Sequence, residues 1–138
     1  MDDLLGLFTQ ASKLLREATD EAMSKHGVRV GQHVVLSRLW EQDGLTPGEI
    51  ARQLGVATPT IVNTATRMEE AGLVTRQPDP ADARLVRLYL TPLGLSAREP
   101  VRAARAALQQ HATAALTDAE RKHLHSALVK IIAQLQDK

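Results

Sequence analysis

The chain has 138 residues, 43% of them apolar and 24% charged, which suits one domain, with or without a helical appendage, and favours a buried core over disorder. It contains no cysteine, so disulfides, thiolate metal sites and a catalytic cysteine are excluded. Aromatic residues make up only 2%, fewer than usual in proteins that stack single-stranded bases, and at a net charge of +1 any basic surface must come from the arrangement of charges.

The first segment carries early acids and regularly interrupting polar residues. We therefore expect neither a signal peptide nor a membrane span, and a cytoplasmic protein. Apolar residues recur at spacings of three and four over residues 4–26, which predicts a helix that Gly27 ends. This apolar stripe needs a partner, either later helices or a second chain. A second helix is predicted over Val30–Glu41.

Two short helices follow. Thr46, Pro47 and Glu49 have the spacing of a capping box, and they open a helix that Gly55 stops. A short turn then leads to a second helix within residues 58–73. Two helices joined by a short turn containing glycine are typical of a helix-turn-helix motif, in which the second helix reads DNA. An ordinary helical hairpin fits these residues equally well.

The second helix is predicted to begin with Thr58 as its N-cap and Pro59 at the first helical position, and to end at Gly72. Its exposed side is polar and has a single charge, which suits a helix that offers donors and acceptors to base edges. The residues on that side are Thr60, Asn63, Thr64 and Arg67.

After Gly72 the apolar period changes from 3.6 to 2, which predicts strands over residues 73–76 and 85–90. Such a hairpin after a DNA-reading helix is a wing, and Arg84 near its tip suits the narrow, electronegative minor groove. Alternatively, Arg84 pairs with Asp82 or Asp79 on a solvated loop. Both interpretations hold if Asp82 orients the guanidinium.

A long helix is predicted from Thr91 to about Ala115, with a kink or break near Glu99 because Pro100 lies inside it. Thr117 and Glu120 form another capping box, which opens the last helix. The predicted fold is mainly α with a two- to three-stranded wing. It combines a winged helix-turn-helix module, residues 30–91, with a helical dimerisation region, residues 1–27 and 92–138. A two-fold dimer would read half-sites roughly 34–36 Å apart.

The sequence gives little support for metal binding or catalysis. Glu120 and His123 lie one turn apart, a spacing that metals can use, but the motif occurs once. No phosphate loop, nucleophile elbow, dinucleotide fingerprint or zinc-protease motif occurs, so we expect neither an enzyme nor a bound cofactor.

The segments TPGEIARQLG, EEAGLVTR, DPADAR and LTPLG stand in the order and spacing of the MarR family of winged-helix regulators, and the resemblance covers nearly the whole chain. It implies an obligate dimer built from the first and last helices. It also implies a regulator, usually a repressor, that a small phenolic or lipophilic acid releases from DNA. The resemblance places His33 and Trp40 on the helix that lines the ligand cleft of the family.

The resemblance also assigns residues to DNA. The family's positions on the DNA-reading helix correspond to Thr58, Thr60, Asn63, Thr64 and Arg67, and its wing motif corresponds to Asp82 and Arg84. Ala83 stands where the family often has a second arginine. Residues 58–87 carry four arginines and four acids, so affinity must come from aiming arginines, Arg87 included, at phosphates.

Our hypothesis from the sequence is therefore a homodimeric transcriptional regulator that binds a pseudo-palindromic duplex and responds to a small-molecule effector. The alternatives are a winged-helix module that binds another protein and a regulator that senses metal through histidines.

Overall fold

The computed structural model describes residues 3–137, which form seven helices and a two-stranded antiparallel sheet. The helices are α1 (Leu4–Ser24), α2 (Val30–Glu41), α3 (Pro47–Leu54), α4 (Thr58–Glu70), α5 (Pro92–Ser96), α6 (Arg98–Ala112) and α7 (Asp118–Gln136). The strands are β1 (Val74–Pro78) and β2 (Val86–Leu90). The predicted fold class, mainly α with a small wing, is confirmed.

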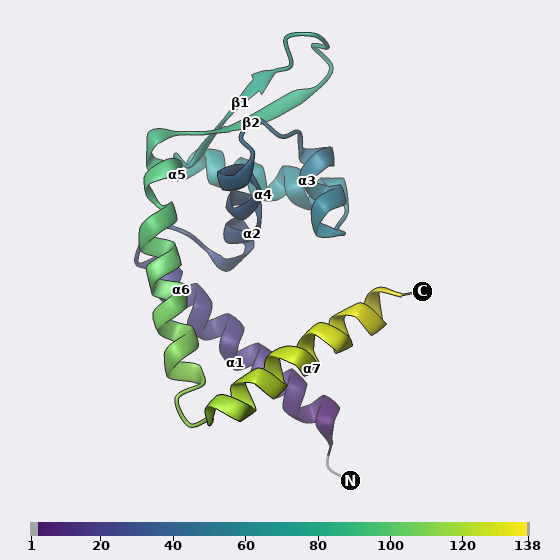
Figure 1. Cartoon of the computed structure of the whole chain (residues 1–138). Coiled ribbons are helices and arrows are strands. Elements are labelled where there is room, and N and C mark those ends of the chain that lie inside the picture. Colours follow the sequence, from purple (N-terminus) through teal and green to yellow (C-terminus); the bar gives the residue numbers. More distant parts are fainter. Residues whose placement is uncertain (1–2, 138) are drawn as a thin grey trace. The chain divides into compact units, whose positions relative to one another are not determined.

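The chain divides into two compact units, of which the first ends at Arg105 and the second begins at Ala106. In the first unit α2, α3 and α4 lie against the base of the sheet, and the loop that joins β1 to β2 projects beyond the helices (Figure 1). The sheet pairs Val74 with Leu90 and Pro78 with Val86, so β1 runs two residues further than predicted. The third strand is reduced to an isolated bridge between Leu45 and Leu88.

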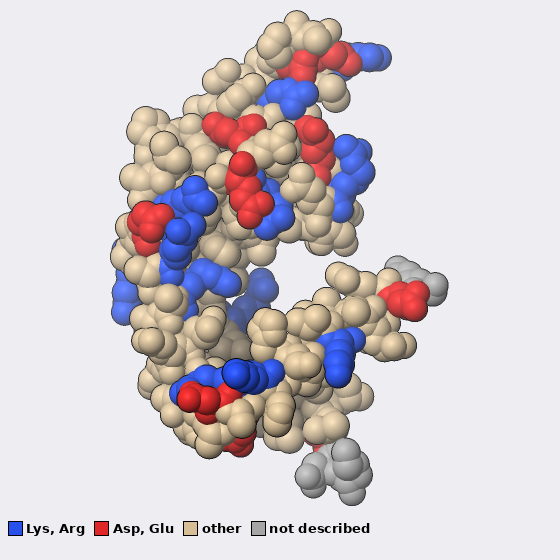
Figure 2. All heavy atoms as spheres, in the orientation of Figure 1, with Lys and Arg blue, Asp and Glu red and all other residues tan. Residues whose placement is uncertain are grey.

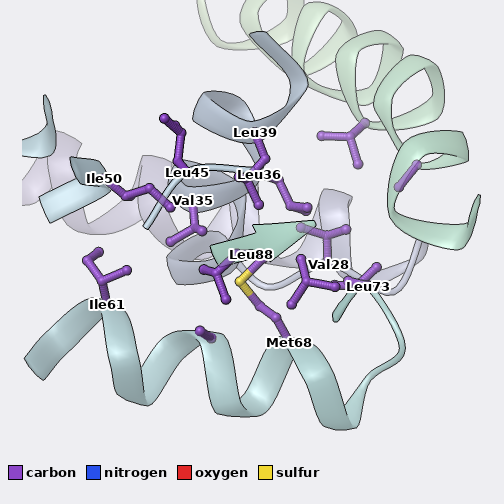
Figure 3. Close-up of a cluster of buried hydrophobic side chains, with 14 of the residues drawn as sticks. Val28, Val35, Leu36, Leu39, Leu45, Ile50, Ile61, Met68, Leu73 and Leu88 are labelled. Atoms are coloured by element: carbon purple, nitrogen blue, oxygen red, sulfur yellow. The ribbon is translucent and has the colours of Figure 1, made fainter. Parts of the chain in front are cut away.

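The core of the first unit forms where apolar faces of the helices meet the inner face of the sheet (Figure 3). Leu36 and Leu39 come from α2, Ile61 and Met68 from α4, and Leu88 from β2, and each is at most 2% exposed. Because α4 contributes one complete stripe to this core, the direction of its remaining side chains is fixed by packing.

Helix α4 begins one residue earlier than its sequence suggests. Ala57, with extended backbone, occupies the N-cap position, and Thr58 and Pro59 are the first two helical residues. The prediction that Thr58 caps the helix is therefore wrong. Proline is tolerated throughout the first turn, where no intrahelical partner exists for its missing N–H, so Pro59 does not distinguish the two registers. Gly72 has φ of 79°, as expected of a left-handed helix stop.

The predicted break near Glu99 is confirmed, since α5 ends at Ser96 and α6 begins at Arg98. Helix α5 is fixed by Thr91, whose hydroxyl accepts from the Gly94 N–H at 3.0 Å and donates to the Gly72 carbonyl. The indole N–H of Trp40 donates to the Gly94 carbonyl at 2.9 Å, which joins α2 to α5.

Two helices carry apolar side chains that remain exposed. On α1 these are Leu4, Leu5, Leu7, Phe8, Leu14 and Leu15, and on α7 they are Leu124, Leu128, Val129, Ile131, Ile132 and Leu135. None of the residues of α7 is buried. Among residues 3–137, no helix is both long and apolar enough to cross a membrane.

The wing is fastened at its base by Arg87 and Asp79. The Arg87 Nε donates to Asp79 Oδ2 at 2.6 Å, and its Nη1 donates to the Gly44 carbonyl at 2.8 Å and to Glu49 Oε1 at 3.3 Å. The Asp79 side chain is only 9% exposed and also accepts from the N–H groups of Ala81 and Asp82. These bonds connect the β1–β2 loop to strand β2 and to the start of α3.

We predict that Asp79→Asn lowers the melting temperature in a pH-dependent way. The hydrogen bond from Arg87 is the main reason why the pKa of Asp79 lies below its ordinary value of 3.8. A carboxyl with a depressed folded-state pKa stabilises the fold above its unfolded pKa, and this stabilisation is lost as pH falls through the folded pKa. The wild type should therefore melt at a higher temperature than the variant near neutral pH, and the difference should shrink as pH drops below 3.8.

Thermal unfolding followed by circular dichroism over this pH range measures the effect. Asp118→Asn is the matched control, because the Asp118 side chain is 97% exposed and its ion pair with Arg121 lies at the surface. Equal melting temperatures of wild type and Asp79→Asn near neutral pH would show that the wing does not depend on this carboxylate.

Candidate nucleic-acid interface

Helix α4 buries Ile61, Ala65 and Met68. At about 100° per residue, the positions opposite to this stripe are Pro59, Asn63 and Glu70. Sequence reasoning placed Asn63 on this face but missed the other two. The helical period could have revealed them, because Ile61 lies at the centre of the buried stripe.

The other predicted positions lie on the two flanks of α4. Thr58 lies on the flank toward the wing, where it lines a groove with Val62 and Arg84. Thr64 and Arg67 lie on the opposite flank, where they line a cleft with residues of α1 and α2. Thr60, at the edge of that flank, is exposed, and its carbonyl accepts from the Thr64 hydroxyl at 2.9 Å. The structure therefore does not gather the five predicted residues on one surface.

Asn63 is exposed, and among residues 3–137 its side-chain amide makes no hydrogen bond that the structure records. The hydroxyls of Thr64 and Thr66 each donate to the backbone carbonyl four residues earlier. A free amide offers both a donor and an acceptor. These can pair with the N7 acceptor and the N6–H2 donor of an adenine edge.

Arg76 of β1 joins the sheet to α4. Its Nη2 donates to the Val62 carbonyl at 3.1 Å and to the Thr66 hydroxyl at 2.5 Å, and its Nε lies 3.8 Å from Glu69 Oε1. The sequence shows Arg76 only as one of the four arginines of residues 58–87, on a predicted strand. Its contacts with α4 are 10 and 14 residues away along the chain, so no local pattern predicts them.

Arg84 extends from the β1–β2 loop with 90% of its side chain exposed. Its Nε and Nη2 donate to the two carboxylate oxygens of Asp82 at 3.0 and 3.1 Å, and the hydrogen bonds from Arg84 lower the pKa of Asp82. The pairing with Asp82 that the sequence suggested is therefore present, and it leaves the guanidinium exposed, while the minor-groove role of Arg84 stays a prediction. The bidentate pairing fixes the guanidinium plane while leaving it open to solvent.

Arg87 is placed differently from our expectation. Its guanidinium is engaged by Asp79, Gly44 and Glu49 rather than directed at a phosphate. We therefore assign Arg87 to holding the wing in place. Around the wing and the neighbouring helices, acidic and basic side chains are interspersed on the face that Figure 2 shows, without a single-sign patch.

The groove between the helix pair and the wing has a volume of about 580 Å³. Helix α3 contributes Pro47 and Arg52, α4 contributes Val62, and the wing contributes Leu85 and Val86. This groove therefore lies between α4 and the wing, and side chains of both line it.

His33 and Trp40 pack edge to face, with ring centroids 5.9 Å apart. Burial, and then the charge of Arg105, lower the pKa of His33, so its imidazole is neutral near neutral pH. Because the Trp40 indole is bonded to Gly94, this pair serves the packing of α2 against α5, and its assignment to a ligand pocket stays a prediction.

The metal alternative gains no support from the described part of the chain, residues 3–137, where no three His, Asp or Glu side chains are grouped to hold an ion. Glu120, which the metal hypothesis pairs with His123, instead accepts from the Thr117 N–H at 2.9 Å within the predicted capping box.

Comparison with known proteins is consistent with this geometry. Residues 29–86 match the model of the MarR family. The chain is 29% identical over 126 residues to the HTH-type transcriptional repressor Rv2887 of Mycobacterium tuberculosis, with 91% of this chain and 90% of that protein covered.

Two solved structures share the fold of the whole chain. The crystal structure of the S. aureus MepR–DNA complex matches with a TM-score of 0.85 at 24% identity, covering 97% of this chain and 99% of that one. The structure of reduced AbfR bound to DNA matches with a TM-score of 0.73 at 25% identity, covering 98% and 93%. Residues 29–86 of this chain therefore match the MarR family, and the fold of the chain is that of its winged-helix regulators.

Proposed function

We propose that this chain is a transcriptional regulator that binds double-stranded DNA by sequence, with α4 in the major groove and Arg84 in the adjacent minor groove. The observation that carries the proposal is the joint presentation of two unlike groups: the free amide of Asn63 on α4 and the exposed, Asp82-oriented guanidinium on the wing. The first suits base edges, and the second suits a narrow, electronegative groove. The DNA-bound structures of MepR and AbfR support this assignment by similarity.

The proposal includes a homodimer. Each of α1 and α7, taken by itself, exposes a stripe of large apolar side chains, and monomeric proteins seldom leave such contiguous surfaces in water. We assign residues 1–27 and 92–138 to dimerisation and residues 30–91 to the duplex. A two-fold dimer reads a pseudo-palindromic operator with half-sites roughly 34–36 Å apart.

Repression, and release from DNA by a small lipophilic or phenolic acid, complete the proposal. Resemblance to the family supports both, and the designation of the M. tuberculosis relative as a repressor supports the first. A rival function is the binding of another protein through the wing, which the exposed Val62, Leu85 and Val86 beside the groove favour. Duplex binding with a steep salt dependence counts against this rival.

Selection of random duplexes against the purified protein tests the proposal. We expect an enriched palindrome, and we expect Asn63→Ala to change the preferred base at one position of each half-site by about 1–3 kcal/mol of discrimination. A folded, dimeric protein that enriches no duplex would contradict the proposed function and favour the rival.

Arg84→Ala should weaken every duplex to a similar extent, because a minor-groove arginine responds mainly to electrostatic potential. Titrations of the enriched and a scrambled duplex at several salt concentrations measure this. Arg102→Ala is the matched control, since Arg102 is an exposed arginine of α6 paired with Glu99. If Arg84→Ala binds both duplexes as tightly as this control does, the wing assignment is wrong.

Leu128→Glu and Ile132→Glu on α7 should each weaken the dimer. Burial of one such side chain contributes about 1.5–3 kcal/mol, so we expect a loss of at least roughly tenfold in dimer affinity. Sedimentation velocity measures the change, and Lys130→Glu, which adds the same side chain between these two positions, should leave the dimer intact. A dimer that withstands both apolar substitutions would show that this face of α7 lies outside the interface.

A further inference from the structure

A charged cleft lies on the flank of α4 that faces away from the wing. Its volume is about 500 Å³, and it is lined by side chains from α1, from the start of α2 and from α4. The charged residues among them are Arg16, Glu17, Asp20, Arg29 and Arg67. None of these residues belongs to the wing, and only Arg67 belongs to the helix pair.

Asp20 and Arg29 neutralise each other across this cleft. The Arg29 Nη2 lies 2.7 Å from Asp20 Oδ2 and its Nε lies 2.9 Å from Asp20 Oδ1, which also accepts from the Val30 N–H at 2.9 Å. The hydrogen bond from Arg29 is the main reason why the pKa of Asp20 falls to about 2. The carboxylate therefore stays ionised, and its lone pairs are directed to Arg29 and to the first N–H of α2.

Two guanidinium groups remain. Among the ion pairs within residues 3–137, none involves Arg16, Arg67 or Glu17. With Asp20 and Arg29 cancelling, the cleft holds two cations against one anion, and a positive charge is left over. The Thr64 hydroxyl, which lines the same cleft and donates to Thr60, retains a free acceptor but supplies no compensating charge.

With α4 in the major groove as proposed, a sugar-phosphate backbone of the duplex runs beside this cleft. The major groove is about 12 Å wide, and a helix with its side chains is about 10–12 Å across, so a helix in the groove has one sugar-phosphate backbone along each flank. On α4 one flank faces the groove beside the wing, and the other faces the cleft. The backbone on the second flank therefore passes beside Arg16 and Arg67.

We propose that Arg16 and Arg67 form a phosphate site for the duplex backbone on the flank of α4 opposite the wing. This assignment rests on the proposed function and departs from the sequence-based prediction for Arg67, which then positions the protein on DNA instead of reading a base. It also brings a cation of α1 to the interface. Residues 58–87 sum to zero charge, so the charge that attracts the duplex comes in part from Arg16, outside the winged module.

The test measures how affinity depends on salt. Removing one phosphate contact lowers the magnitude of the slope of log K against log salt by about 0.9. We expect Arg16→Gln and Arg67→Gln each to lower the slope by about this amount and to weaken the enriched and the scrambled duplex by the same factor. Glu17→Gln should have the opposite effect and strengthen both duplexes, because it removes the only unpaired anion of the cleft.

Two variants separate this effect from damage to the fold. Lys13→Gln removes a charge one turn earlier on α1, at a position that does not line the cleft, and should keep the wild-type slope. Arg16→Lys retains the charge and should restore most of the affinity that Arg16→Gln loses. Equal circular dichroism melting curves establish that each variant is folded.

Three results would overturn the inference. If Arg67→Gln changes the ratio of affinities for the two duplexes, Arg67 reads a base. If Arg16→Gln and Arg67→Gln keep the slope of Lys13→Gln, no backbone phosphate lies in the cleft, although Arg84→Ala still weakens binding and the proposed function stands. If the folded wild type binds no duplex, the proposed function fails, and this assignment fails with it.

Discussion

The fold of the DNA-facing side depends on one ion pair, between Arg87 and Asp79. A charged carboxylate that is only 9% exposed is tolerated because a guanidinium and two backbone N–H groups satisfy its oxygens. The Nη1 of the same guanidinium donates to the Gly44 carbonyl and to Glu49, so the loop before α3, the capping box of α3 and the wing meet at one side chain. Without this pair, the loop end of the wing would keep little besides its strand pairing, since the core side chains of the sheet, Val74 and Leu88, lie closer to its base.

The sequence predicts well what depends on near neighbours. The capping boxes at Thr46 and Thr117 are confirmed, because their partners lie three residues away and the bonds form within one turn. The break between α5 and α6 and the left-handed Gly72 follow in the same way from local backbone preferences. The cap of α4 is the exception, since the local rule favours Thr58, yet Ala57 takes the N-cap position without a side-chain hydrogen bond.

The candidate site was harder to predict, for a physical reason. Alternation along β2 places Arg87 on one face of the strand but does not reveal acceptors 38 and 43 residues earlier in the chain. The polar side of α4 likewise divides into an outward face, a flank beside the wing and a flank beside α1. Which residue lies on which of these surfaces depends on the elements that pack beside α4. The exposure of Asn63 and Arg84 was predictable, because an exposed helix centre and a loop tip need no tertiary partner to be accessible.

Arg76 donates to the Val62 carbonyl and the Thr66 hydroxyl. These hydrogen bonds hold the sheet and α4 rigidly together in the free protein. In the proposed complex, the angle between α4 in the major groove and the wing in the minor groove is then set during folding, and the DNA must adjust on contact. A duplex whose grooves meet at another angle must bend or twist to fit. Flexible base steps between the two contacts then raise affinity at positions that no side chain touches.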